Sequence, residues 1–139
     1  MIHAIREHCI CAGHRVVNQG GACERLHGHE YKFELYCTAS ELNRIGMILD
    51  FGEIKKRLCQ WLEDSWDHRM LLWEADPWGP EIAKIDPSVV FVPFNPTAEK
   101  IAEHMVEVVG PEVLKGTGVI LAGCRVNETS KCAAFYELD

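Results

Sequence analysis

The sequence lacks the features of membrane proteins and exported proteins. It has no run of about 18 apolar residues, which a membrane-spanning helix needs. Residues 1–10 contain Arg6, Glu7 and two histidines, where a secretory signal would have an apolar segment. We therefore expect a cytoplasmic protein with no membrane partner.

Basic residues are also scarce. Lysines and arginines number 14 against 21 aspartates and glutamates, and the formal net charge is -7. A nucleic-acid-binding surface concentrates positive charge, so we expect no nucleic-acid partner. A small cationic pocket for an anionic substrate remains compatible with this charge, and its candidate residues are Arg15, Arg25 and Lys131.

The seven cysteines include no Cys-x-x-Cys pair, which a four-sulfur metal site would use. Their odd number leaves at least one thiol without a partner in the chain, so we expect reduced thiols. Most of them lie in apolar strand or helix patterns, where cysteine packs as a small hydrophobic residue. Cys9 and Cys11 with His14 could form a rival metal cluster, but no Cys-x-x-Cys pair is present to complete a four-sulfur site.

Internal repeats and low-complexity tracts are absent, and 47% hydrophobic with 25% charged residues is ordinary for a globular protein. We expect one domain over residues 1–139. Apolar, β-branched or alternating patterns predict strands at residues 2–12, 29–38, 119–127 and 132–138. The first two strands would form a hairpin through Gly20 and Gly21.

Two helices are expected between these strands. Asp50 can cap a helix that runs to about residue 63, and Thr97 can cap a second that ends at about residue 109, before Gly110 and Pro111. His104 lies off the apolar stripe of the second helix, so we expect it to be solvated. Residues 71–95 form a long proline-containing connection. This order predicts an α+β fold, with a four-stranded antiparallel sheet and two helices on one face.

Three histidines form a candidate metal site. His27 and His29 are two residues apart, so in a strand their side chains point to the same face. His14 ends the preceding apolar stretch, and the hairpin could return it beside them. Three imidazoles without a fourth protein ligand leave an open coordination position, as in catalytic zinc sites. Cys23 would lie near the metal, which would favour its thiolate.

Five segments of the chain together resemble the 6-pyruvoyl-tetrahydropterin synthase family, which includes the 6-carboxy-tetrahydropterin synthases of queuosine (7-deazapurine) biosynthesis. The segments are CERLHGH (23–29), ILDF (48–51), DH (67–68), NPTAE (95–99) and VNET (126–129). The resemblance implies the tunnelling fold (T-fold), in which the sheets of several subunits join into a barrel. It also implies a homo-oligomer, a hexamer or a related assembly, with active sites between subunits.

The resemblance also assigns roles to individual residues. It implies that Cys23, Asp67 and His68 act together as a catalytic triad, and that zinc is held by the three histidines. Trp66 stands where the family usually has leucine, so the local packing around the Asp67–His68 pair can differ. Glu24 directly follows the motif cysteine, so an altered cleavage of the substrate's side chain stays open. For substrate binding the resemblance implies three residues: Glu128, Thr97 and Glu99. Helix capping and charge near a helix N-terminus also explain the last two.

The implied function is that of a zinc-dependent lyase. Its substrate would be 7,8-dihydroneopterin triphosphate, and its products 6-carboxy-5,6,7,8-tetrahydropterin, acetaldehyde and triphosphate. Two alternatives stay open at this point. One is a 6-pyruvoyl-tetrahydropterin synthase, which eliminates triphosphate and keeps the three-carbon side chain. The other is a protein that binds zinc or pterin without catalysis.

Overall fold

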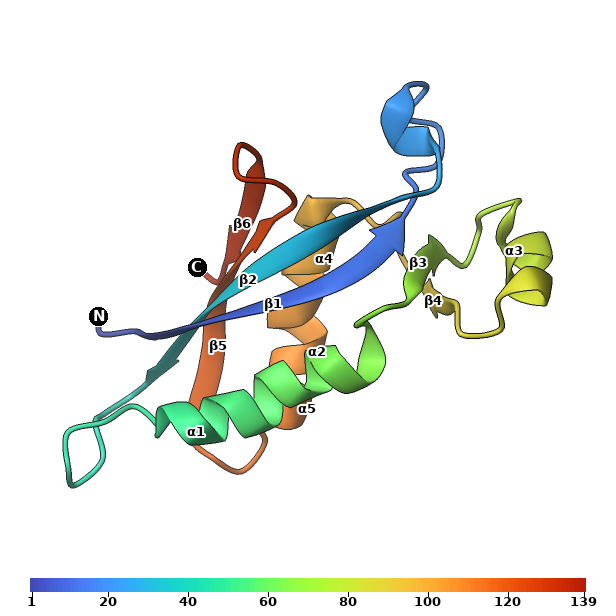
Figure 1. Ribbon diagram of the computed structural model, residues 1–139. Coiled ribbons are helices and arrows are strands. Elements are labelled where there is room, and N and C mark those ends of the chain that lie inside the picture. Colours follow the sequence, from blue (N-terminus) through green and yellow to red (C-terminus); the bar gives the residue numbers. More distant parts are fainter.

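A curled six-stranded sheet with the order β4-β3-β1-β2-β5-β6 is the centre of the computed structural model, which describes residues 1–139 (Figure 1). The strands are β1 (Ala4–His14), β2 (His27–Ala39), β3 (Met70–Trp73), β4 (Val90–Val92), β5 (Val119–Asn127) and β6 (Ala133–Glu137). Strands β1, β2, β5 and β6 pair antiparallel, whereas β3 pairs parallel with both β1 and β4. The α+β class is confirmed. The expected four-stranded antiparallel sheet is wrong, because the sheet is mixed and has six strands.

The two unexpected strands lie in the connection 71–95 and its border. They contain four and three residues, which is too short for an alternating pattern to stand out in the sequence. Leu71 and Leu72 are both buried, as in a parallel strand that is covered on both faces. A third helix, α3 (Gly79–Ile85), also lies in this connection. Because β3 pairs with the end of β1, His14 has a strand on each side.

Both strands of the β1–β2 hairpin reach further toward their connecting loop than expected. Strand β1 ends at His14 instead of residue 12, and β2 begins at His27 instead of residue 29. In the antiparallel register these two histidines lie opposite each other. Alternation along β2 then places His27, His29 and Tyr31 on one face.

The first long helix consists of α1 (Phe51–Ile54), a π-helical segment (Lys55–Cys59) and α2 (Gln60–Ser65). Its start is as expected, since the Asp50 carboxylate accepts a hydrogen bond from the Gly52 N–H at 2.7 Å. None of the helices is both long and apolar enough to cross a membrane.

The second long helix continues past its expected end. It consists of α4 (Ala98–His104), a π-helical segment (Met105–Val109) and α5 (Gly110–Val113). The expectation that Gly110 and Pro111 end the helix is therefore wrong. The wider π turn comes just before Pro111, and such a turn can accommodate a residue that has no N–H.

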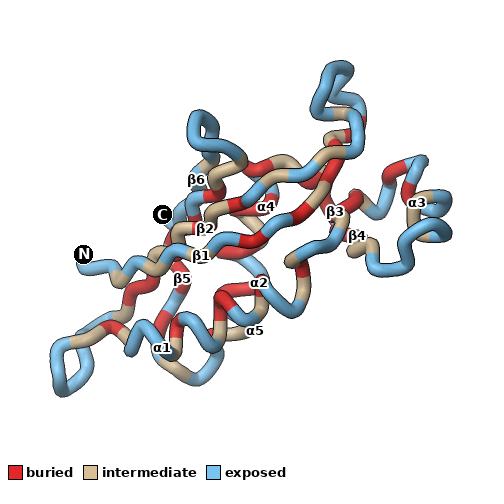
Figure 2. Tube along the Cα trace, viewed as in Figure 1, coloured by how far each residue is buried: buried red, intermediate tan, exposed pale blue.

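The core lies between one face of the sheet and the two long helices (Figure 2). Phe33 of β2, Leu58 of the first helix and Ile101 of the second are among its almost fully buried side chains. His104 was expected to be solvated, but it is half-buried, and its ring stacks on Trp66 with 5.9 Å between ring centroids. The sequence-based prediction failed here because the aromatic partner comes from another helix.

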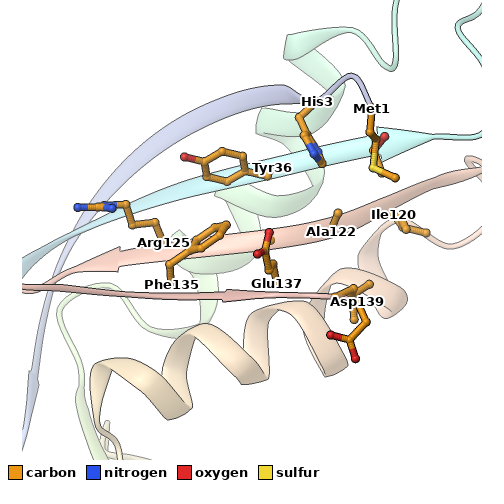
Figure 3. A pocket seen from close by; sticks show the side chains of 12 residues that line it. Met1, His3, Tyr36, Ile120, Ala122, Arg125, Phe135, Glu137 and Asp139 are labelled. Carbon is orange, nitrogen blue, oxygen red and sulfur yellow. The ribbon is translucent and has the colours of Figure 1, made fainter.

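The opposite face of the sheet is open. Near the two chain ends it is hollowed between β2, β5 and β6, where the rings of Tyr36 and Phe135 have centroids 5.2 Å apart (Figure 3). His3 lines the same hollow, whereas His14 is at the far end of β1. Eleven residues of extended chain span on the order of 35 Å, so this hollow is remote from the three histidines.

Candidate metal centre and active site

Three histidine side chains converge at the loop end of the β1–β2 hairpin. The candidate ligand atoms of His14, His27 and His29 lie within 4.8 Å of one another. His14 comes from the last position of β1 and the other two from the first residues of β2, so the antiparallel register brings them together. The structure thus unites the three expected ligands, and this cluster could hold a metal ion.

Backbone carbonyls determine which ring nitrogen faces the cluster. His14 Nδ1 donates to the Pro96 carbonyl at 2.6 Å, and His27 Nδ1 donates to the Arg25 carbonyl at 2.7 Å. A carbonyl only accepts, so each neutral ring has its proton on Nδ1 and a lone pair on Nε2. The two Nε2 atoms are 3.0 Å apart. Two lone pairs at this distance repel unless a proton or a cation lies between them.

The spacing suits a cation of the size of zinc. Zinc–imidazole bonds of about 2.0–2.1 Å in a tetrahedral site place neighbouring ligand atoms roughly 3.3 Å apart. The separation between the His14 and His27 nitrogens is close to this value. The Nε2 of His29 is buried and makes no hydrogen bond, although a Glu128 carboxylate oxygen lies 3.1 Å away, and a bound ion would satisfy it. The residues present therefore fit a metal ion.

Burial lowers the pKa of two of the three imidazoles, His14 and His29. The side chain of His14 is 1% exposed, and burial lowers its pKa to about 4, against the effect of its bond to Pro96. Burial also lowers the pKa of His29, although the nearby Glu128 carboxylate opposes the shift. A metal ligand must be free of its proton, so these shifts favour metal binding near neutral pH.

Glu128 contacts the cluster directly. Its Oε2 atom is 3.1 Å from His29 Nε2 and 3.4 Å from His14 Nε2. The residue directly follows β5, and the pairing of Asn127 with Lys32 of β2 carries it toward the histidines. The carboxylate therefore lies beside the nitrogens of His29 and His14 and does not extend from an exposed turn.

Asp67 and His68 form a hydrogen-bonded pair beside β1. Asp67 Oδ2 accepts from His68 Nδ1 at 2.8 Å, and Asp67 Oδ1 accepts from the Cys11 N–H at 2.9 Å. The His68 N–H donates to the Cys11 carbonyl at 2.6 Å. Burial raises the pKa of Asp67, but the bonds from His68 and Cys11 outweigh it and hold this pKa below its ordinary value.

His68 has a backbone and an exposure that are unusual for histidine. Its φ of 59° lies in the left-handed region, and its side chain is 79% exposed. Residues held in such a conformation by their surroundings are concentrated at functional sites. An oriented, accessible imidazole next to a carboxylate can exchange protons with a substrate or with a side chain of another subunit.

Cys23 lies exposed in a 3₁₀ turn, Ala22–Glu24. Its carbonyl accepts from the Val16 N–H at 2.8 Å. The Glu24 carboxylate accepts from the Gly20 N–H at 2.7 Å, so it stabilises the loop. Of the two adjacent candidates for a proton-transfer role, Cys23 is thus the one whose reactive group has no structural task.

Cys23 does not meet Asp67 and His68 within one chain. The Asp67–His68 pair is anchored to Cys11, and the cysteine turn is anchored to Val16. Five residues of mostly extended chain, on the order of 16 Å, separate these two anchors. The three residues expected to act as a triad therefore lie at two separate places of the subunit.

A buried ion pair next to the cysteine turn was missed. Arg15 is 2% exposed and donates two hydrogen bonds to Asp76, at 2.7 and 2.6 Å. Its guanidinium also lies 3.6 Å from the centre of the Trp78 ring and donates to the Glu24 carbonyl. Burial raises the pKa of Asp76, but Arg15 outweighs it and keeps this pKa low. Arg15 is thus a structural residue, which corrects its interpretation as part of a cationic pocket for an anionic substrate.

The segment 95–99 supports the site from behind. The Asn95 amide makes two hydrogen bonds with the backbone of Val17, at 2.9 and 3.0 Å, and the Pro96 carbonyl holds His14. The Thr97 hydroxyl accepts from the Lys100 N–H, as expected for a helix cap, and Glu99 is exposed. Neither position tests the expected contacts of Thr97 and Glu99 with a substrate, so these contacts stay a prediction.

Comparison with known proteins agrees with this geometry. Residues 4–139 match the family described as 6-pyruvoyl tetrahydropterin synthase. The chain belongs to this family. A 6-carboxy-5,6,7,8-tetrahydropterin synthase of Rickettsia felis is 31% identical over 134 residues, which cover 95% of this chain and 97% of the relative.

Solved structures of the 6-pyruvoyl tetrahydropterin synthase family and of similar proteins share the fold. An uncharacterized protein from Wolinella succinogenes superposes with a TM-score of 0.86 at 24% identity, covering 99% of this chain and 98% of that one. The 6-pyruvoyl tetrahydropterin synthase of Caenorhabditis elegans superposes with a TM-score of 0.70 at 22% identity, covering 99% and 96%. At these identities the likeness concerns the fold alone.

Proposed function

We propose that the chain is a zinc-dependent lyase that converts 7,8-dihydroneopterin triphosphate to 6-carboxy-5,6,7,8-tetrahydropterin, acetaldehyde and triphosphate. The cluster of His14, His27 and His29 carries the proposal, in a chain whose relative of nearly equal length is named for that product. Three protein ligands leave an open position, which is typical of catalytic zinc. Zinc bound there would polarise hydroxyl or carbonyl oxygens of a substrate and acidify the neighbouring C–H bonds.

The proton transfers are assigned to Cys23, Asp67 and His68. The thiolate of Cys23 takes a proton from the substrate side chain, and the imidazole of His68, oriented by Asp67, exchanges protons with that thiol. Because the two parts are separated within one chain, we propose that they meet between subunits of a homo-oligomer. The exposed His68 ring and the exposed Cys23 turn support this arrangement, since both face away from the core.

Substrate recognition is assigned to Glu128, Glu99 and Thr97. A carboxylate can accept two parallel hydrogen bonds from a pterin, one from a ring N–H and one from the exocyclic amine. The contact of Glu128 with His29 and His14 also supports a task at the metal. Glu99, at the exposed start of α4, is the second carboxylate available for the pterin.

The nearest alternative is elimination of triphosphate with retention of the three-carbon side chain, as in 6-pyruvoyl-tetrahydropterin synthases. The same ligands and the same acid–base residues serve both reactions. A non-catalytic zinc- or pterin-binding protein is less well supported, because such a protein would have no need for the oriented Asp67–His68 pair.

Product analysis tests the proposal. Zinc-loaded protein is incubated with 7,8-dihydroneopterin triphosphate, and the products are identified by mass spectrometry, with the Cys23→Ala variant as a control. We expect 6-carboxytetrahydropterin and acetaldehyde from the parent and a loss of about two orders of magnitude or more in the variant. A 6-pyruvoyl product would establish the alternative reaction. Unchanged substrate with fully loaded protein would leave only the binding function.

A further inference from the structure

Tyr31 is a buried phenol whose hydroxyl has no hydrogen-bond partner. Its side chain is 1% exposed. Only two buried side-chain polar atoms lack a partner, and they are the Tyr31 hydroxyl and the Nε2 of His29. An unsatisfied buried hydroxyl destabilises a fold, and phenylalanine would fill the same space without this penalty. The cost of burying this hydroxyl suggests that it has a function beyond packing.

Both unsatisfied atoms lie at the histidine cluster. Tyr31 follows His27 and His29 on the same face of β2. Its ring is edge-on to His29, with centroids 5.4 Å apart, and edge-on to His14, with centroids 5.8 Å apart. Tyr31 thus packs directly against two of the three candidate metal ligands.

The Glu128 carboxylate is an acceptor at the same histidine cluster. The Tyr31 ring packs against His29 and His14. The same carboxylate contacts His29 Nε2 and His14 Nε2. A phenol donates one hydrogen bond, and an ionised carboxylate can accept several.

We propose that Tyr31 is a positioning residue of the metal centre, whose hydroxyl donates to the Glu128 carboxylate when the three imidazoles hold their ion. The hydroxyl then fixes the direction in which this carboxylate faces the ion and its ligands. The inference rests on the proposed metal site. Mutation of groups that orient the surroundings of a metal commonly weakens its binding by about 10–100-fold.

The test compares Tyr31→Phe with Tyr36→Phe. Both variants remove one hydroxyl from β2, but Tyr36 lies on the open face against Phe135. Three properties are measured: stability in chelator by chemical denaturation, zinc affinity by competition with a chromophoric chelator, and the visible spectrum of the cobalt-loaded protein. For Tyr31→Phe we expect unchanged or higher metal-free stability, about tenfold weaker zinc binding and an altered cobalt spectrum. Tyr36→Phe should match the parent in zinc affinity and spectrum.

A double variant tests whether the hydroxyl acts through Glu128. In a Glu128→Gln background, Tyr31→Phe should weaken zinc binding much less than it does in the parent, because the shared interaction is already disturbed. Three results would overturn the inference: parental zinc affinity and spectrum in Tyr31→Phe, lower metal-free stability of that variant, or additive losses in the double variant.

A parent protein that binds no zinc would overturn the metal site itself, and the inference about Tyr31 with it. His27→Ala serves as the reference for a lost ligand. Tight binding by the parent, weak binding by His27→Ala and tight binding by Tyr31→Phe would preserve the proposed function and reject only the role of Tyr31.

Discussion

At the scale of single residues, the second nitrogen of each imidazole decides what the cluster can bind. Pro96 and Arg25 accept from the Nδ1 atoms of His14 and His27, so the Nε2 lone pairs face each other. Without a cation this arrangement depends on burial and on the rigidity of the hairpin. The stability of the metal-free protein should therefore depend strongly on pH.

Metal-free protein should lose stability as the pH falls from 6.5 toward 4. Burial lowers the pKa of His14 from 6.5 to about 4, so in this range the unfolded chain binds a proton that the folded chain does not. The contribution of His14 is complete above pH 6.5, and up to about 3 kcal/mol is lost by pH 4. Urea denaturation in chelator across this range measures the loss.

The His14→Gln variant is the control for this pH dependence. Burial also lowers the pKa values of His29 and His104, so the variant should retain a weaker dependence of the same sign. Identical slopes in parent and variant would show that the titration of His14 does not contribute.

Substitutions of Glu128 and Glu99 should differ in their effects on zinc binding and on pterin binding. Glu128→Gln should weaken both zinc and pterin binding, because its carboxylate is 3.1 Å from His29. Glu99→Gln should weaken pterin binding alone, because Glu99 is exposed at a helix start. For each we expect a loss of about 2–4 kcal/mol in pterin affinity by calorimetry, as for a charge-assisted bond that leaves donors unpaired.

The two measurements can also contradict these assignments. The expected loss of zinc affinity in Glu128→Gln rests on the contact of this carboxylate with the imidazoles. Parental zinc affinity in Glu128→Gln would limit Glu128 to a role in pterin recognition. Parental pterin affinity in Glu99→Gln would reduce Glu99 to a residue that favours the start of α4 through its charge.

At the scale of elements, the loop that carries Cys23 is held by segments far away in the sequence. Arg15 links this loop to Asp76, and Asn95 binds the backbone of Val17. The loop itself has little apolar burial, so these polar contacts replace a core. Its position therefore depends on the connection between α2 and α4.

Replacing one partner of the buried ion pair should destabilise the fold more than replacing both partners. Arg15→Met or Asp76→Leu alone leaves a buried charge without its partner and should lower the free energy of unfolding by about 3–5 kcal/mol. The double variant should lose less than the sum of the two. Chemical denaturation measures these values, and peptide mapping after alkylation reports whether Cys23 becomes more reactive.

The matched control is the Glu81–Lys84 pair on α3. Both side chains are highly exposed, so Lys84→Met and Glu81→Leu should change stability little. Additive losses for Arg15→Met and Asp76→Leu would mean that the two residues stabilise the loop independently, in conflict with their mutual hydrogen bonds.

At the scale of the whole molecule, the separated parts of the site point to assembly. The sheet ends in two edge strands, β4 and β6, whose unpaired backbone groups can pair with another subunit. Phe91 and Phe135 on these strands are large exposed apolar side chains. Both features favour contacts between copies of the chain, as expected for sites that two subunits complete.

Mixing two inactive variants should restore activity. Cys23→Ala and His68→Ala each remove one part of the site, so each pure protein should be nearly inactive. In a randomly mixed homo-oligomer, about a quarter of the intersubunit sites would combine an intact Cys23 with an intact His68. Turnover of the co-refolded mixture, compared with the parent, measures this fraction. No recovery in a mixture that mass spectrometry shows to be co-assembled would place the whole site in one subunit.

The sequence by itself determined the local parts of this protein. The spacing of His27 and His29, the caps at Asp50 and Thr97, and the alternation in β2 depend only on neighbours within a few residues, and the structure has them as expected. The α+β class followed from the order of these elements. Family membership followed from several short motifs that occur in the same order along the chain.

Only the tertiary structure decided which residues from distant parts of the sequence contact each other. The pairing of β3 with β1, the Arg15–Asp76 bond and the contact of Glu128 with His29 join positions that are tens of residues apart. The packing of His104 on Trp66 is of the same kind. Periodicity shows which face a side chain occupies and does not show which element covers that face. The partners of buried polar groups are therefore decided when the sheet curls and the helices pack against it.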